Sequence, residues 1–307
     1  MTAAFLKGDE WANHHILLSR NINSFLFVNR AHFVDLLASV LTKTRYSPHE
    51  FAESVLPAVY AETTEAADNP AATALDLAHT LAFRSGLGAS LFAAPHAHLT
   101  PEDARSFAHT AFSKENIAVV GTGIDSGLLS KLVGHSFLPL PSATTAAPTP
   151  TKYFGGESRV AAGGHSPHPQ TIFIGYGTTA LNLHELATLK AYLSPHPHLK
   201  WAHGSASPLF EGLPARARIE PVLLPYTDAA LFGVLVQAPT IKEVHDAGRI
   251  TVNVLKGAAG SVKPEELKKA VSKAKFEAAS VLERREGLVG AAIDQVRRGF
   301  IGPITIT

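Results

Sequence analysis

Histidine is the residue type in this chain that could most readily hold a metal, because there are 16 histidines and no cysteines. Several histidines cluster along the chain: His96 and His98, His165 and His168, His196 and His198, and His203. Most of them stand beside proline or glycine, whereas helical zinc sites need ligands one turn apart together with a carboxylate base. We therefore expect solvated loop histidines, and no metal site, from these clusters.

Known catalytic motifs are incomplete or absent. His184-Glu185 begins like His-Glu-x-x-His, but Thr188 stands where the second histidine would follow, and the inverted motif His-x-x-Glu-His does not occur. The Gly-x-Ser-x-Gly elbow of serine hydrolases is also missing, and a chain without cysteine can form no thiolate nucleophile, disulfide or iron–sulfur site. The residues predict no catalytic, cofactor-binding or metal site.

Two glycine pairs imitate a nucleotide-binding loop. Gly121 and Gly123 follow an apolar run and precede a helical one, and Gly175 and Gly177 form a second pair. A dinucleotide fold needs another strand with an acidic residue soon afterwards, but residues 138–150 are rich in proline and carry no charge. We interpret both pairs as ordinary strand-to-helix turns.

The composition limits the class of protein. The chain has 307 residues, of which 46% are hydrophobic and 17% are charged, so it can form packed cores. A formal net charge of +1 argues against a dedicated nucleic-acid binder. The sequence contains no apolar run of about 18 to 20 residues, so no transmembrane segment is predicted. Residues 1–10 resemble neither a secretory signal nor a mitochondrial presequence, so any organellar address has been removed or was never present.

The elements that would position these residues change in kind along the chain. Helices are predicted over 31–43, from Ser47-Pro48, over 70–84 and from Thr100, because apolar positions recur at helical spacing behind capping residues. A buried strand over 116–121 and a short helix around 128–133 follow. In the second half we predict strands, a helix over 182–192, and a long helix from Pro264 that breaks near Gly287 and resumes to Arg298. The predicted strands are 158–162, 171–176, 219–224, 230–237 and 250–254.

This order predicts an α+β protein of two tandem domains, each a mixed or antiparallel sheet backed by helices. Residues 138–152 are the proline-rich linker, between an N-terminal domain over 1–137 and a C-terminal domain over 153–307.

Several stretches together resemble the pitrilysin/insulinase-type metallopeptidase superfamily, and within it the fungal core subunits of mitochondrial ubiquinol–cytochrome c reductase. The most specific is Tyr153-Phe-Gly-Gly-Glu-Ser-Arg159. The others are 32–44, 49–51, 69–70, 82–84 and 86–88 in the first half, and 175–178, 189–193, 200–201, 207–209 and the final helix from Ala274 in the second. The resemblance covers most of residues 5–298.

The resemblance implies a processing-peptidase-like fold that lacks its opening strands and is incomplete at both ends. Active members hold zinc with His-x-x-Glu-His and a later glutamate, whose position Glu62 resembles. One glutamate cannot hold catalytic zinc, so the resemblance implies an inactive peptidase homologue in which Glu62 is a leftover helix carboxylate.

It further implies a structural subunit of respiratory complex III, part of an oxidoreductase complex but not an enzyme itself, with no cofactor of its own. The expected place is peripheral, on the matrix side of the mitochondrial inner membrane. Expected partners are core protein 1, cytochrome b, the c-type cytochrome and the Rieske protein. The alternative is a subunit of the zinc-dependent mitochondrial processing peptidase, with its non-catalytic alpha partner favoured over the active peptidase.

Overall fold

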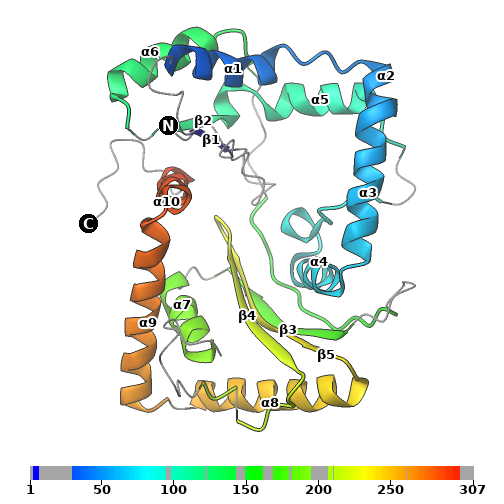
Figure 1. Cartoon of the computed structure of the whole chain (residues 1–307), viewed down its shortest axis with the longest axis vertical. Coiled ribbons are helices and arrows are strands. Elements are labelled where there is room, and N and C mark those ends of the chain that lie inside the picture. The colour runs from blue at the N-terminus through cyan, green and yellow to red at the C-terminus, as the bar shows by residue number, and fades with distance from the viewer. Residues whose placement is uncertain are drawn as a thin grey trace. The chain divides into compact units, whose positions relative to one another are not determined.

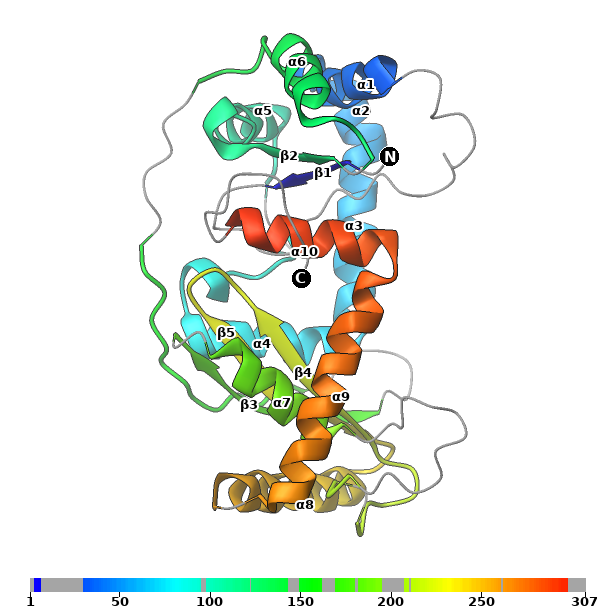
Figure 2. The same cartoon turned by 90° about the vertical axis from the view of Figure 1, so that its left-hand side faces the viewer.

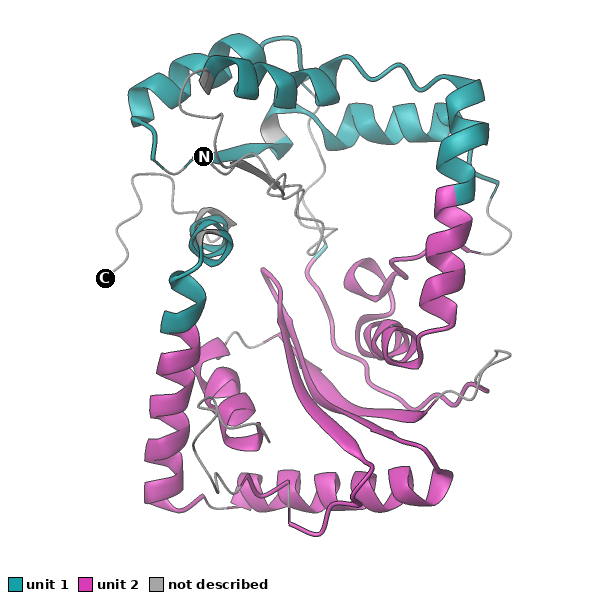
Figure 3. Ribbon diagram, in the orientation of Figure 1, with its two compact units in different colours: residues 1–57, 96–149, 279–307 teal, residues 58–95, 150–278 magenta. Residues whose placement is uncertain are grey.

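The computed structural model describes residues 3–6, 30–94, 98–121, 123–142, 149–161, 169–179, 182–194, 207–209, 211–260 and 262–297. Helices and two small antiparallel sheets make up these residues, which confirms the predicted α+β class (Figure 1). The chain divides into two compact units (Figure 3). Unit 1 contains residues 1–57, 96–149 and 279–307, and unit 2 contains 58–95 and 150–278. Each unit therefore takes a helical stretch from the opposite half of the chain.

Unit 1 is built around a two-stranded ribbon. Strands β1 (Ala3–Leu6) and β2 (Ala118–Gly121) pair antiparallel, with Ala3 opposite Gly121. Helix α10 (Arg285–Arg297) lies along this ribbon (Figure 2), where its Val289 and Ile293 pack against Val120. The other helices that begin in this unit are α1 (Arg30–Thr42), α2 (Pro48–Glu50), α3 (Leu56–Ala67), which continues into unit 2, α5 (Pro101–Ala111) and α6 (Ser126–Ser136).

A second apolar cluster in unit 1 joins α1 to α6. Phe33, Val34 and Leu37 of α1 are buried against Phe137 and Leu140, which follow α6. Ile117 and Val119 border the same cluster, whereas Val120 belongs to the α10 cluster. Because successive side chains of a strand point to opposite faces, β2 separates these two apolar layers.

Unit 2 is built around a three-stranded antiparallel sheet in the order β3-β5-β4. The strands are β3 (Gln170–Thr178), β4 (Arg218–Pro225) and β5 (Ala230–Ala238), and their register places Ile174 and Pro221 on either side of Val234. β5 is buried almost throughout, as a central strand should be. Pro221 and Pro225 lie in β4, an edge strand, where a missing backbone donor is tolerated.

Helices cover both faces of this sheet (Figure 1). Helix α4 (Pro70–Phe83) lies on one face, where the ring of Phe83 lies over Gly177. Helices α7 (Leu183–Leu193) and α8 (Ile241–Gly260) lie on the other, where the largest core cluster includes Leu193, Phe232 and Ala247. Helix α9 (Pro264–Leu282) follows α8, and Lys273 Nζ donates a hydrogen bond to the carbonyl of Ser194 at the end of α7 (3.2 Å).

Most predicted helix starts are confirmed, and their caps differ in detail. Thr100 forms a reciprocal capping box with Asp103, and Asn69 Oδ1 accepts hydrogen bonds from the backbone N–H groups of Ala71 and Ala72. Ser47 precedes α2 without capping it, because its hydroxyl donates to the Glu50 carboxylate (2.6 Å).

Two predicted strands are wrong. Residues 250–254 belong to α8, because Ala247 and Thr251 recur at helical spacing on its buried face and the Thr251 hydroxyl donates to the Ala247 carbonyl. Tertiary packing here overrides the strand preference of a β-branched run. Residues 158–161 are exposed and form no strand, and residue 162 lies outside the described part.

The predicted break in the C-terminal helix is confirmed, between Leu282 and Arg285. A Cβ atom on Gly287 would lie 1.9 Å from the Val281 carbonyl oxygen, so only glycine fits there.

Candidate functional site

The residues considered for zinc do not come together in the described part of the chain. Glu62 lies exposed on α3, and His184 and Glu185 lie exposed on α7. His98 is exposed before α5, whereas His96, His165, His168, His196, His198 and His203 lie outside the described residues. Among described residues, no group of three histidine, aspartate or glutamate side chains is placed to hold a metal ion.

The glycine pairs have structural roles. Gly121 ends β2 and Gly123 lies in the turn from β2 to α6, as predicted for a strand-to-helix connection, and Asp125 caps that helix by accepting from the N–H of Leu128 (2.9 Å). The second prediction is wrong, because Gly175 and Gly177 lie inside β3. A Cβ atom on Gly175 would lie 2.4 Å from the carbonyl oxygen of Phe232, so this glycine permits close strand packing.

The Tyr153–Arg159 stretch, the most specific of the resembling runs, fastens the start of the second half of the chain to α4. The N–H of Phe154 donates to the carbonyl of Ala82 (2.9 Å), and the guanidinium of Arg84 lies 4.4 Å from the centre of the Phe154 ring. Gly155 has a φ of +73°, a conformation that favours glycine. Glu157 and Arg159 form an ion pair at 2.7 Å that is exposed, so it contributes little to stability. The contacts described for this stretch are thus one backbone hydrogen bond and one ring contact with the end of α4, and most of its residues are exposed.

A partly buried polar cluster joins α4 to the turn between β4 and β5. The Nδ1 atom of His79 lies 2.7 Å from the carbonyl oxygen of Leu75 and therefore donates to it. In the neutral ring Nε2 is then an acceptor, and the Tyr226 hydroxyl donates to it (2.5 Å). Burial lowers the pKa of His79, against smaller raising effects of the Leu75 hydrogen bond and the Asp76 charge. Phe83 packs edge-on against the Tyr226 ring.

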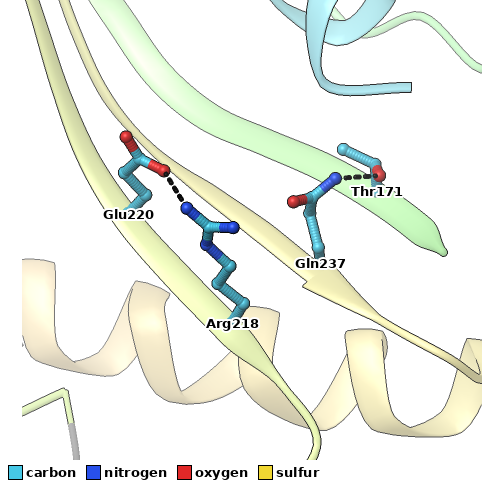
Figure 4. A network of polar contacts seen from close by, with 4 residues as sticks. All are labelled: Thr171, Arg218, Glu220 and Gln237. Carbon is cyan, nitrogen blue, oxygen red and sulfur yellow. Dashed lines mark hydrogen bonds and ion pairs between the residues drawn. The ribbon is translucent and has the colours of Figure 1, made fainter. Parts of the chain in front are cut away.

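Polar side chains also form contacts on the strands of unit 2 (Figure 4). Gln237 Nε2 on β5 donates to Thr171 Oγ1 on β3 (3.2 Å), which ties the central strand to one edge. On the opposite edge strand β4, Arg218 and Glu220 form an exposed ion pair at 3.4 Å. The first contact joins two strands, and the second places charged groups on an edge strand that faces water. Neither contact pairs a nucleophile with a base.

Sequence patterns missed two features that the fold creates. His79 and Tyr226 are 147 residues apart, and only the packing of α4 on the sheet brings them together. The second is an apolar pocket in unit 1 between β2 and α6, with a volume of about 550 Å³. The sequence signal for this pocket was the helical spacing of apolar residues in α6. That spacing indicates that one face of the helix is covered, but it does not identify what covers it.

None of the described helices is both long and apolar enough to cross a bilayer. The described residues form packed cores and exposed surfaces, and they do not gather a set of reactive groups in one place.

No known protein-family profile matches the chain. Individual relatives do. The chain is 42% identical over 284 residues to the mitochondrial cytochrome b-c1 complex subunit 2 of Cryptococcus neoformans, a match that covers 91% of this chain and 64% of the relative. It is 30% identical over 271 residues to the subunit of the same name from Debaryomyces hansenii, covering 88% of this chain and 68% of the relative.

The fold has a solved counterpart in the structure "Complex III2 from Candida albicans, Inz-5 bound". A chain of that structure matches with a TM-score of 0.70 and 17% identity, over 90% of this chain and 68% of the other. This likeness shows the shared fold.

The chain spans only 64% and 63% of the lengths of the relatives from Cryptococcus neoformans and Yarrowia lipolytica. The Debaryomyces hansenii relative is matched over more than two thirds of its length. The chain therefore belongs to the family of the mitochondrial cytochrome b-c1 complex subunit 2.

Proposed function

We propose that this chain is a non-catalytic structural core subunit, core protein 2, of mitochondrial respiratory complex III, the ubiquinol–cytochrome c reductase. The observation that carries the proposal is its 42% identity over 284 residues to a relative named as subunit 2 of that complex. Two units that bury apolar cores but gather no reactive groups in their described parts suit a protein that works through its surfaces.

The proposal extends to place and partners. The subunit would lie on the matrix side of the inner membrane as a peripheral protein, bound to core protein 1 and to the redox subunits cytochrome b, the c-type cytochrome and the Rieske protein. It would contribute to an oxidoreductase complex without catalysing a reaction itself, and it would bind no nucleic acid. The relatives' name, a subunit of the cytochrome b-c1 complex and not a peptidase, supports the assignment as an inactive homologue.

We also propose that residues 1–137 and 153–307 are two domains joined by the linker 138–152. Each domain would lend a helical stretch to the other, since residues 58–95 pack in unit 2 and residues 279–307 in unit 1. Such an exchange makes the folding of the two domains interdependent.

Affinity purification from fungal mitochondria tests the proposed function. The tagged chain, purified from digitonin-solubilised membranes, should bring cytochrome b and the c-type cytochrome with it. Alkaline carbonate should release it from the membrane, and protease should reach it only after the inner membrane is opened. Recovery with processing-peptidase subunits and without cytochrome b, or zinc-dependent cleavage of peptides by the purified chain, would overturn the proposal.

A variant that cannot pack unit 2 supplies the control. A Cβ atom on Gly233 would lie 2.3 Å from the ring of Phe173, so Gly233→Val should fold poorly and lose cytochrome b. The exposed change Glu62→Gln should keep the association, since Glu62 is assigned no role in it.

A further inference from the structure

The apolar pocket of unit 1 is formed by one face of α6 and one face of β2. Its volume of about 550 Å³ lies within the range of about 300 to 1,000 Å³ typical of small-molecule sites. The strand contributes Val119, Ile117 lies just before the strand, and the segment after α6 contributes Leu138 and Leu140. The helix contributes residues that share one face, Ser126, Leu129, Ser130, Val133 and Gly134, and Phe137 follows at its end.

Small residues on the helix leave the pocket open. A Cβ atom added at Gly134 would meet nothing within 4 Å, although Gly134 lies inside a helix. Glycine costs a helix interior about 0.5 to 1 kcal/mol relative to alanine, and the space beside it shows that no steric need requires glycine here. Gly134, which lowers the stability of the helix, therefore stands in the wall of the pocket where the space is open.

A cation, Lys114, lies beside this apolar space. Lys114 lines the pocket, is exposed to solvent, and forms no ion pair with any residue that the structure describes. The N–H of Lys114 donates to the carbonyl of Pro141 (3.0 Å), which holds it beside Leu138 and Leu140. A short turn joins β2 to α6, so Ser126 lies toward the opposite end. The pocket is therefore charged at one end and apolar along its length.

We propose that this pocket binds one acyl chain of an anionic amphiphile, with the acidic headgroup at Lys114. Aliphatic carbon would replace water along Ile117, Val119, Leu129 and Val133, which stabilises the complex roughly in proportion to the apolar area buried. The ammonium group supplies charge complementarity at the mouth. A free fatty acid and a chain of an acidic phospholipid share this chemistry, and the experiment below distinguishes them.

A polypeptide strand added beside β2 is the competing occupant. It would bring several side chains and a row of backbone groups, and it would gain nothing in particular from a lysine at one end. The charge of Lys114 beside an apolar lining favours the amphiphile.

Competition against a fluorescent fatty acid tests the proposal with the full chain. Dodecanoate and 1-dodecanol share the same chain and differ in charge. Gly134→Leu fills the pocket and should weaken binding of both by at least about tenfold, whereas Gly134→Ala improves the helix alone and should bind both as the wild type does. Thermal melts verify that each variant is folded.

The headgroup is tested at Lys114. Lys114→Gln should weaken the binding of dodecanoate about two- to fivefold, which is the range of an exposed ion pair, and leave the affinity for dodecanol unchanged. Lys131→Gln, elsewhere on α6, is the matched control and should change neither. Binding to phosphatidylglycerol vesicles but not to phosphatidylcholine vesicles, lost in Gly134→Leu, would identify a phospholipid chain, and binding of dodecanoate alone a free fatty acid.

Equal affinities of Gly134→Leu and Gly134→Ala would overturn the proposal, as would a folded wild type that binds neither dodecanoate nor the vesicles. A Lys114→Gln variant whose affinities for dodecanol and dodecanoate fall equally would also contradict it. None of these outcomes bears on co-purification with cytochrome b, so the proposed function stands or fails separately.

Discussion

At the scale of single residues, the contact between His79 and Tyr226 connects sequence positions that no local pattern relates. The ring of His79 is held from one side by the Leu75 carbonyl of its own helix and from the other by the Tyr226 hydroxyl. Burial favours the neutral imidazole, in which Nε2 accepts from the tyrosine, whereas a protonated ring would have to reverse this bond and donate to the Tyr226 oxygen. The cluster therefore couples the packing of α4 on the sheet to pH.

Acidification should destabilise unit 2 through His79. Burial lowers the folded-state pKa of His79 below the ordinary value of 6.5, so the unfolded state binds its proton more readily. The contribution to stability is fully present above pH 6.5 and is lost as pH falls through the folded-state pKa. Urea unfolding at a series of pH values should show that the free energy of unfolding falls less steeply with acidification for His79→Leu than for the wild type.

The control for this prediction is His49→Gln, because the His49 side chain is 74% exposed and pairs with the exposed Glu53. It should retain the acid slope of the wild type. Identical slopes for the wild type and His79→Leu would show that the His79 contact carries no pH dependence.

Glycines inside the sheet set how closely its strands and helices approach. A Cβ atom on Gly233 would lie 2.8 Å from the carbonyl oxygen of Ile174, and a backbone atom cannot move aside as a side chain can. Gly233→Ala should therefore lower the free energy of unfolding by about 1 to 3 kcal/mol. Gly257→Ala in α8, where a Cβ atom meets nothing within 4 Å, should instead raise it by about 0.5 to 1 kcal/mol. Paired urea titrations of the two variants with opposite signs would confirm the assignment.

At the scale of elements, the sequence predicts most helix starts because capping is local. Thr100-Pro101-Glu102-Asp103 contains its whole cap within four residues, and the structure shows that capping box. The strand predicted over 250–254 failed because its β-branched residues carry a local preference that burial of Thr251 in α8 outweighs. Whether Gly175 and Gly177 form a turn or a strand depends on Phe83 and Phe232, which are distant in sequence and invisible to a local pattern.

The caps of α4 and α7 supply a matched test of local stabilisation. Asn69 and Asn182 occupy the same N-cap position, but only Asn69 accepts hydrogen bonds from the first turn of its helix. Asn69→Ala should cost about 1 kcal/mol, because two backbone donors lose their acceptor. Asn182→Ala should cost less, because the Asn182 side chain donates to the Glu185 carboxylate and accepts no bond from the first turn of α7. Equal losses in chemical denaturation would show that the Asn69 side chain does not cap α4 in solution.

At the scale of the whole molecule, each unit is completed by a stretch from the other half of the chain. Helix α4 precedes the proline-rich linker, yet it covers one face of a sheet whose strands all follow it. No periodicity in the sequence indicates this exchange, because an apolar helical face looks the same whichever sheet it covers. The predicted fold class was therefore accessible from sequence, and the partner of each helix was not.

The exchange predicts that the strands of unit 2 need α4 in order to fold. A fragment of residues 150–278 would expose the face on which Phe83 packs, including the otherwise buried Leu231 and Tyr226, and should aggregate or bind hydrophobic dyes. Residues 58–95 joined to 150–278 through a flexible linker should be monomeric and unfold cooperatively. The same fusion with Phe83→Asp is the matched control, and it should behave like the fragment without α4, because a carboxylate would be buried without a partner. A fragment of 150–278 that unfolds with the same midpoint as the fusion would show that α4 is dispensable for the fold of unit 2.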